Sequence, residues 1–238
     1  MSTAKSDPHA TILIDGVAMP VLVRRSARAR AYRLTIDSAR GALRLSLPTR
    51  ANLKKALGWA QDHEGWVRAQ MAKQPAITLL EHGAAFPLEG REVIIEWVEG
   101  ATRTIRLEGD RLLLGGAAES VGARVQRWLI MRARAVLETE SQELAREHGL
   151  IVASVGVGDT RSRWGSCASS GAIRYSWRLI LCPPEVRRAT VAHELAHLLH
   201  MDHSPAFHAA HKRIYGADPR PAREWLRAHG AGLHRYRA

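Results

Sequence analysis

Short stretches of alternating apolar and polar side chains occupy much of the chain before residue 116. Alternation with a period of two places every second side chain on one face of a strand, which is typical of a sheet with one buried face. The stretches form two sets, at residues 12–14, 21–23, 32–36 and 43–47, and at residues 86–88, 93–98, 104–107 and 111–114. Asp15-Gly16 and later glycines supply turns between them. Residues 52–71, between the two sets, have helical spacing. We therefore expect a β-rich N-terminal region, residues 1–116, with one helix and no internal repeat.

The pattern changes to helical spacing near residue 116. Residues 120–148 are predicted to form one long amphipathic helix, because Gly149 follows as a typical stop. Further elements are expected in the order strand, turn-rich segment, strand and helix, at residues 151–157, 161–167, 172–182 and 186–200. This order predicts an α+β protein whose residues 117–238 form a second domain.

The predicted helix 186–200 carries the sequence His193-Glu194-Leu195-Ala196-His197. Two histidines at i and i+4 project from one face of a helix, so both imidazoles can reach one metal ion. Glu194 follows the first histidine and can face the open coordination position, where a general base is needed. The alternative is a core helix whose histidines only satisfy hydrogen bonds, but burying three such groups without compensation is costly.

A catalytic zinc ion takes three protein ligands, and the third must come from beyond this helix. The candidates are His200, His203, His208 and His211. His200 lies about 10 Å along a straight helix from His193, at about 1.5 Å per residue, which is too far for bonds of about 2.0–2.1 Å. A new helix is predicted at Ser204-Pro205, since Ser is a good N-cap and Pro suits the first helical position. We favour His203, which lies at this corner.

Three segments together carry a resemblance to a known family: HELAHLLHMDHSPAF, RWGSC upstream, and IRYSWRLILCPPEV between them. With these segments the chain closely resembles the YgjP-like metallopeptidases, a family related to the SprT-like and WLM groups of small zinc-dependent gluzincins. The resemblance implies a zincin-like (minigluzincin) metallohydrolase domain at residues 117–238. It also implies zinc on His193, His197 and His203, with Glu194 as the catalytic carboxylate. All four residues are present in this chain.

The ligand set predicts a hydrolase, and the resemblance implies a metallopeptidase that acts on a peptide or protein. Zinc lowers the pKa of a bound water from 15.7 toward about 7, and Glu194 would take the proton and return it to the leaving amine. One alternative is hydrolysis of a phosphoanhydride such as a nucleoside triphosphate, although no phosphate-cradling glycine-rich loop is present. Another is a DNA-associated protein with structural zinc, which would need a fourth protein ligand.

The RWGSC segment is a second candidate for the site. A strand beside a metal-bearing helix can pair with an extended peptide, and either this segment or residues 172–182 could do so. We interpret Trp164 as a residue that anchors the core more than as one that contacts substrate. Cys167 is not expected to act as a metal ligand or as a nucleophile. The residues that could stabilise an oxyanion are Arg163, Tyr175, Arg178 and Tyr215.

Composition restricts the partners and the compartment. The net charge of +12 would attract nucleic acid or nucleotides, but the basic residues are scattered, and the 30 Arg against 5 Lys could reflect genomic base composition. The densest basic run, residues 24–30, is interpreted as a solvated hairpin loop. Two cysteines make no disulfide framework, and neither a signal-peptide core nor a membrane span is visible, so a cytoplasmic protein is expected.

Overall fold

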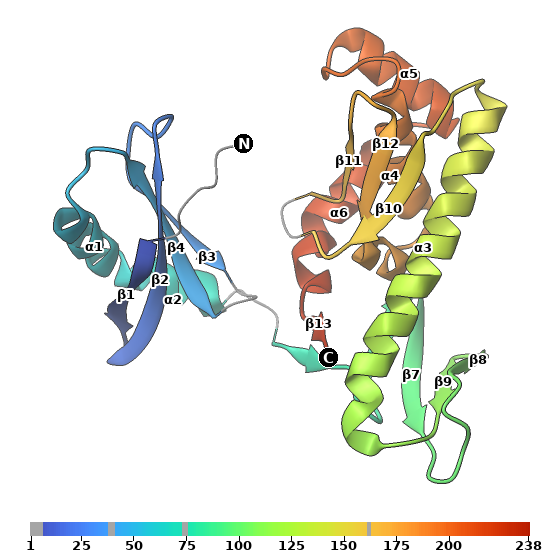
Figure 1. Ribbon diagram of the computed structural model, residues 1–238, viewed down its shortest axis with the longest axis horizontal. Coiled ribbons are helices and arrows are strands. Elements are labelled where there is room, and N and C mark those ends of the chain that lie inside the picture. Colours follow the sequence, from blue (N-terminus) through green and yellow to red (C-terminus); the bar gives the residue numbers. More distant parts are fainter. Residues whose placement is uncertain (1–6, 38–40, 73–75, 161–162) are drawn as a thin grey trace. The chain divides into compact units, whose positions relative to one another are not determined.

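The computed structural model describes residues 7–37, 41–72, 76–160 and 163–238. The chain divides into two compact units, residues 1–76 and residues 77–238, and each has its own hydrophobic core. Sheets fill the N-terminal part and the C-terminal helices carry a histidine cluster, so the predicted α+β class is confirmed (Figure 1).

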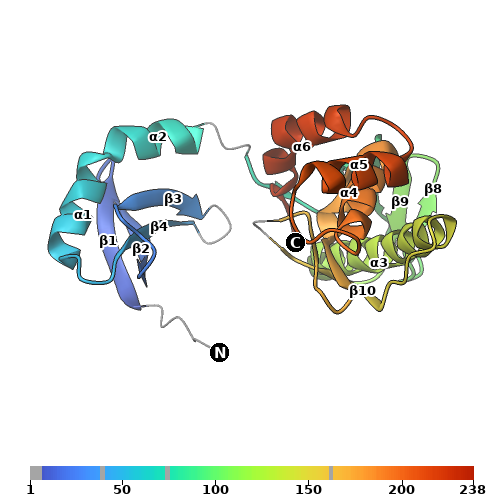
Figure 2. The same ribbon diagram turned by 90° about the horizontal axis from the view of Figure 1, so that it is seen from above.

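The first unit is a four-stranded sheet with two helices on one face (Figure 2). Its elements are β1 (Asp7–Ile14), β2 (Val17–Ser26), β3 (Arg33–Asp37), β4 (Ala42–Pro48), α1 (Leu53–Asp62) and α2 (Glu64–Ala72). The predicted single helix 52–71 is therefore two helices, which meet at His63. The Asn52 side chain caps the first by accepting from the Lys55 amide. Alternate strand residues such as Val21 and Leu45 face Ala56 on α1, as the period of two predicted.

The second unit contains another four-stranded sheet. Its strands are β6 (Ala85–Leu88), β7 (Arg91–Trp97), β8 (Arg106–Glu108) and β9 (Arg111–Leu114), in the order β6-β7-β9-β8. The long helix α3 (Val121–Glu147) follows a 3₁₀ turn, η1 (Ala118–Ser120), and matches its predicted range closely. Apolar residues of α3 such as Val125 and Leu129 share a core with Phe86 and Ile95 of this sheet.

The two four-stranded sheets have the same topology, which no repeat in the sequence revealed. The order β1-β2-β4-β3 of the first becomes β6-β7-β9-β8 in the second, with antiparallel outer pairs around a parallel central pair in both. The first hairpin turns alike in the two sheets: Asp15 and Glu89 both have φ 51°, and each is followed by a glycine with positive φ. The likeness is one of topology, without a repeat in the sequence.

The compact units also divide at residue 76, whereas the sequence suggested a boundary at residue 116. Strands β6 to β9 bury their apolar side chains against α3 and belong to its core, not to that of β1 to β4. Alternation along a strand identifies its buried face but not the element that covers that face.

The rest of the second unit places the helix that carries the histidine motif beside a small sheet. It contains β10 (Ser154–Gly158), β11 (Gly165–Cys167), β12 (Ala172–Ser176), η2 (Trp177–Leu181), α4 (Pro184–Ala196), α5 (Pro205–Tyr215), α6 (Arg220–Leu233) and a short pair formed by β5 (Thr78–Leu79) and β13 (Tyr236–Arg237). The sheet order β10-β12-β11 leaves β11 at one end.

Two predictions for this part of the chain need correction. The predicted strand 172–182 ends at Ser176, whose hydroxyl accepts from the Arg178 amide and starts a 3₁₀ turn. The segment 161–167, predicted as turn-rich, contains strand β11, and its Arg161 and Ser162 lie outside the described residues. None of the helices in the described part of the chain is both long and apolar enough to cross a membrane.

Candidate metal centre

Helix α4 presents the histidine motif from a buried platform. Pro183 and Pro184 begin the helix, and Glu185 gives its first turn the negative charge that suits the macrodipole. The helix ends at Ala196, with His197 as its C-cap, and not at residue 200 as predicted. The amide of Leu199 turns back to the Ala196 carbonyl and its side chain is exposed, so the core no longer supports a further helical turn.

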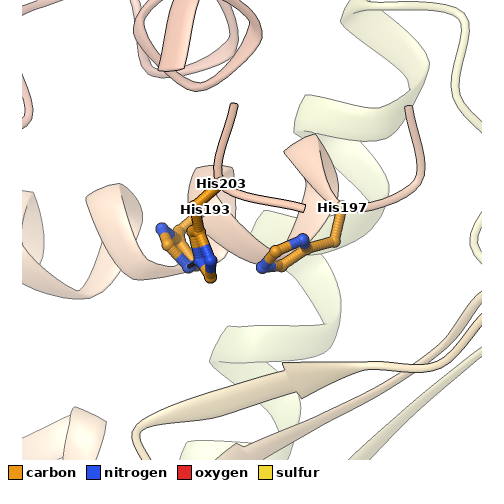
Figure 3. Close-up of side chains that lie close together, drawn as sticks. All are labelled: His193, His197 and His203. Carbon is orange, nitrogen blue, oxygen red and sulfur yellow. Dashed lines mark hydrogen bonds between the residues drawn. The ribbon is translucent and has the colours of Figure 1, made fainter. Parts of the chain in front are cut away.

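The imidazoles of His193, His197 and His203 converge (Figure 3). One ring nitrogen from each lies within 4.8 Å of the others, and the Nε2 atoms of His193 and His203 are 3.3 Å apart. Two zinc–nitrogen bonds of about 2.0–2.1 Å that meet at a tetrahedral angle separate their nitrogens by about 3.3–3.4 Å. The three donors therefore fit a zinc-sized ion, as the sequence predicted, and their role as ligands remains a prediction.

A capped turn brings His203 to the other two histidines. The Asp202 carboxylate accepts from the Ser204 amide at 3.2 Å, and the Ser204 hydroxyl accepts from the Phe207 amide at 3.4 Å. Ser204 is thus the N-cap of α5 and Pro205 its first residue, which confirms the predicted helix start. The turn reverses the chain after α4, so His203 reaches back toward a helix that has already ended.

The other three candidate histidines do not join the cluster of possible ligand atoms in the described residues. The His200 carbonyl accepts from His197 Nδ1 at 3.1 Å. Because a carbonyl can only accept, His197 carries its proton on Nδ1 and leaves Nε2 for a metal. His211 is buried and donates from Nε2 to the Ala189 carbonyl at 3.0 Å, whereas His208 is exposed.

Phe207 is part of this site, although the sequence did not single it out. Its fully buried ring lies 4.9 Å, 4.5 Å and 4.7 Å from the rings of His193, His197 and His203, measured between centroids. Contact with all three imidazoles restricts their rotation and excludes water from one side of the cluster. Its position in the first turn after Ser204-Pro205 was the only signal in the sequence.

Burial keeps two of the three histidines, His193 and His197, neutral. Burial lowers the pKa of His193 to about 3, and the nearby His211, His197, His203 and Arg223 add to the effect. Burial likewise lowers the pKa of His197. Neutral imidazole is the form that binds a metal. At neutral pH these two imidazoles therefore need no deprotonation before an ion enters.

Glu194 lies on the same helix, buried, next to the histidine cluster. It is 4% exposed, and this burial raises its pKa to about 7, against a smaller lowering by Arg163. Its side chain packs against the backbone of Gly165 at the start of β11, where an added Cβ would lie 2.4 Å from the carboxylate and 2.6 Å from Cγ. Only a glycine leaves room for the carboxylate there. This requirement was invisible in the sequence because it joins residues 29 positions apart.

Trp164 links β11 to helix α6. A Cβ atom at Gly230 would lie 2.7 Å from its ring, and the His234 ring lies 5.8 Å away between centroids. The tryptophan is only half-buried and lines a cavity beside Glu194, so it combines the anchoring role that we favoured with a position at the site.

Cys167 of β11 is half-buried as well, and burial raises the pKa of its thiol, which disfavours the thiolate that a nucleophile needs.

Three of the four oxyanion candidates are engaged elsewhere. Tyr175 is buried and its hydroxyl lies 3.0 Å from that of Ser141 on α3. Arg178 is buried in an ion pair with Asp159, and the Tyr215 hydroxyl donates to the Glu185 carbonyl at 3.2 Å. Arg163 is exposed and close enough to Glu194 to influence its pKa.

Comparison with known proteins identifies the class. The family model for the YgjP-like metallopeptidase domain matches residues 30–229, and the chain therefore belongs to this family. The match extends from the first compact unit to α6, and it implies a peptide or protein substrate. Neither the curated proteins nor the solved structures include a match to this chain.

Proposed function

We propose that this protein is a zinc-dependent metallopeptidase in which His193, His197 and His203 hold the ion and Glu194 is the general base. The observation that carries the proposal is the 3.3 Å separation of the His193 and His203 nitrogens, with His197 completing a set of three. Three imidazoles with one open position are the donor set of catalytic zinc sites. When bound, zinc would supply Lewis acidity to a water molecule and to the scissile carbonyl.

Glu194 has the properties that proton transfer requires. Its pKa of about 7 means that the carboxylate can take a proton from the attacking water and release it to the leaving amine near neutral pH. Packing against Gly165 and a position on a buried helix keep the carboxylate in one place while it does so.

Strand β11 supplies a place for the peptide. It lies at one end of its sheet and pairs with β12, so its other edge can receive an extended chain by backbone hydrogen bonding. Gly165 of β11 touches Glu194, which would bring a bound peptide next to the general base. The exposed Arg163, two residues earlier, is the best placed of the candidate residues to stabilise developing negative charge.

The test is hydrolysis by the purified protein, reconstituted with one equivalent of zinc. We expect cleavage of an unstructured protein such as casein, detected by mass spectrometry of the products, and no release of phosphate from nucleoside triphosphates. Glu194→Gln should retain the zinc and lose about 10²–10⁴-fold in kcat. Phosphate release without peptide cleavage would replace the peptidase by the phosphoanhydride hydrolase. Full activity of the Gln variant would remove Glu194 from the mechanism.

A second candidate function belongs to residues 1–76, for which we propose nucleic-acid binding. This segment has 13 Lys and Arg against 5 Asp and Glu, a net charge of +8, whereas residues 77–238 have 22 against 18 and a net charge of +4. On the sheet face opposite the helices, Arg24 and Arg33 flank Ser46 in one row across three strands. Guanidinium groups in such a row suit a phosphate backbone.

Fluorescence anisotropy with a labelled single-stranded oligonucleotide tests this second function. Affinity should fall steeply as salt rises. An affinity that is independent of salt would argue against it.

A further inference from the structure

A cavity of about 220 Å³ lies beside the candidate metal centre, between helices α4 and α6. Helix α4 contributes one stripe of residues to it, Val186, Ala189, Thr190 and His193, at the i, i+3, i+4 and i+7 spacing of a single face. Helix α6 contributes Ala222, Arg223 and Leu226 from the opposite side, and Trp164 closes the third side. Two rigid helices and an anchored indole thus form the walls.

The walls are mostly apolar. Val186, Ala189 and Ala222 are buried hydrophobic residues, and the indole of Trp164 and the side chain of Leu226 add further apolar area. An apolar protein cavity of about 150 Å³ is large enough to hold benzene. A cavity of this size therefore holds a group of about the size of a leucine or phenylalanine side chain.

The cavity is continuous with the catalytic groups. His193 and Glu194 belong both to its lining and to the candidate metal centre. A ligand held at the metal centre would therefore lie directly beside the cavity and could extend one side chain into it. Nothing in the proposed mechanism uses this space.

Arg223 gives the cavity a positive charge. Its side chain is exposed, it lines the cavity, and among the described residues no carboxylate lies within ion-pair distance of it. A positive group here repels ammonium and guanidinium groups that approach the cavity.

We propose that this cavity is the subsite that selects the substrate: it takes an uncharged apolar side chain next to the cleaved bond, Ala222 limits its size and Arg223 excludes cations. The proposal rests on the proposed peptidase function, because it assumes that a peptide binds across the metal centre. It assigns the substrate class as peptides with a leucine-like or phenylalanine-like residue beside the scissile bond.

Three hydroxamates test the subsite without requiring turnover, since a hydroxamate chelates the metal and its tail samples the neighbouring space. Acetohydroxamate has no tail, 4-methylpentanohydroxamate has an apolar tail, and 6-aminohexanohydroxamate has a cationic one. Isothermal titration of the zinc-loaded full chain should show at least tenfold tighter binding of the apolar probe than of acetohydroxamate, since each buried methylene contributes about fourfold. The cationic probe should gain nothing.

Variants on α6 locate the effect. Ala222→Phe fills the cavity and should reduce the ratio of apolar to acetohydroxamate affinity to near one. Because Ala222 is buried and this variant could fail to fold, Leu226→Ala provides a second test: an enlarged cavity should favour 5-phenylpentanohydroxamate over the shorter probe. Arg223→Gln should improve binding of the cationic probe. The matched control is Ala228→Phe, a change on an exposed position of α6 that should leave the ratios at their wild-type values.

The outcomes separate the two proposals. Equal affinities of the apolar probe and acetohydroxamate for the wild-type protein would overturn the subsite, even if peptides are cleaved. A clear preference for the apolar tail together with no peptide cleavage would uphold the apolar binding cavity beside the metal centre and overturn the peptidase, and with it the assignment of the cavity to a peptide side chain. Failure of acetohydroxamate to bind the zinc-loaded protein would overturn the metal centre and the subsite together.

Discussion

The two four-stranded sheets share a topology but have different neighbours. In the first, the hairpin turn Asp15-Gly16 is exposed: Asp15 pairs with the exposed Arg68, and nothing lies within 4 Å of a Cβ built on Gly16. In the second, the corresponding turn Glu89-Gly90 packs on the start of α4, the helix that carries the histidine motif, where a Cβ on Gly90 would lie 3.2 Å from Pro184. The same turn is thus exposed to solvent in one unit, whereas in the other it packs against the helix that carries the histidine motif.

Hydrogen bonds and ion pairs extend this difference. The Glu89 amide donates to the Ile180 carbonyl at 2.8 Å, and the Glu89 carboxylate pairs with Arg132 of α3 and with Arg187 of α4. Arg187 is buried and also binds Glu140 through two nitrogens. One supersecondary structure therefore serves two purposes, and what differs is the set of elements that pack against its turn. The predictions below test whether the second unit, unlike the first, depends on such buried contacts.

The largest effect on stability is expected from Glu194→Gln in the metal-free protein. The folded protein binds a proton at Glu194 with a pKa of about 7, against 4.5 for a free glutamate, so the wild type loses stability as the pH rises from 4.5 to 7. The Gln variant lacks this loss and should be more stable by about 3 kcal/mol above pH 7. Urea denaturation at pH 4 and pH 8 measures the difference. A gain of equal size at both pH values would contradict burial of a carboxylate.

The next largest effect is expected from Gly165→Ala, and it concerns catalytic activity. The added methyl group would collide with the Glu194 carboxylate and displace it, and a displacement of about 1 Å can lower a rate by about 100-fold. The zinc content should not change, because the histidines are not touched. Gly232→Ala is the matched control, since nothing lies within 4 Å of a Cβ there. Wild-type kcat in Gly165→Ala would show that the carboxylate needs no fixed position.

The two hairpin turns allow a direct comparison through equivalent substitutions. Glu89→Gln weakens a partly buried network that includes Arg187 and should cost about 1–3 kcal/mol of unfolding free energy. Asp15→Asn breaks exposed pairs with Arg68 and should cost less than about 1 kcal/mol. Chemical denaturation of both variants provides the measurement. Equal costs would mean that the second turn does not support helix α4.

The smallest effect concerns the basic face of the first unit. Replacing Arg24 and Arg33 with Ala removes two cationic groups from the open sheet face. Each phosphate contact contributes about 0.7 to the slope of log affinity against log salt for single-stranded nucleic acid, so the magnitude of this slope should decrease by about 1.4. Replacing Arg106 and Arg111, exposed residues of the second sheet, serves as the control of equal charge. The same reduction in both double variants would indicate attraction to net charge without a defined face.

Much of the site was predictable because its determinants are local. The spacing of His193 and His197, the cap at Ser204 and the proline after it lie within 13 residues, and they correctly placed three converging imidazoles. The end of α4 at Ala196 was missed, since helical spacing in the sequence continued while the buried surroundings did not. The alternating strands were recognised for the same local reason.

The features that the sequence left undetermined all involve residues distant in the chain. The sequence by itself determined the strands, the long helix, the histidine motif and the turn to His203, because hydrophobic period, capping and metal-ligand spacing act over a few residues. Only the tertiary structure decided that β6 to β9 belong with α3, that Gly165 must leave room for Glu194 and that Phe207 packs on all three imidazoles. Close packing determines these contacts. The hydrophobic pattern along the chain shows that a side chain is buried, but it does not show which residue the side chain contacts.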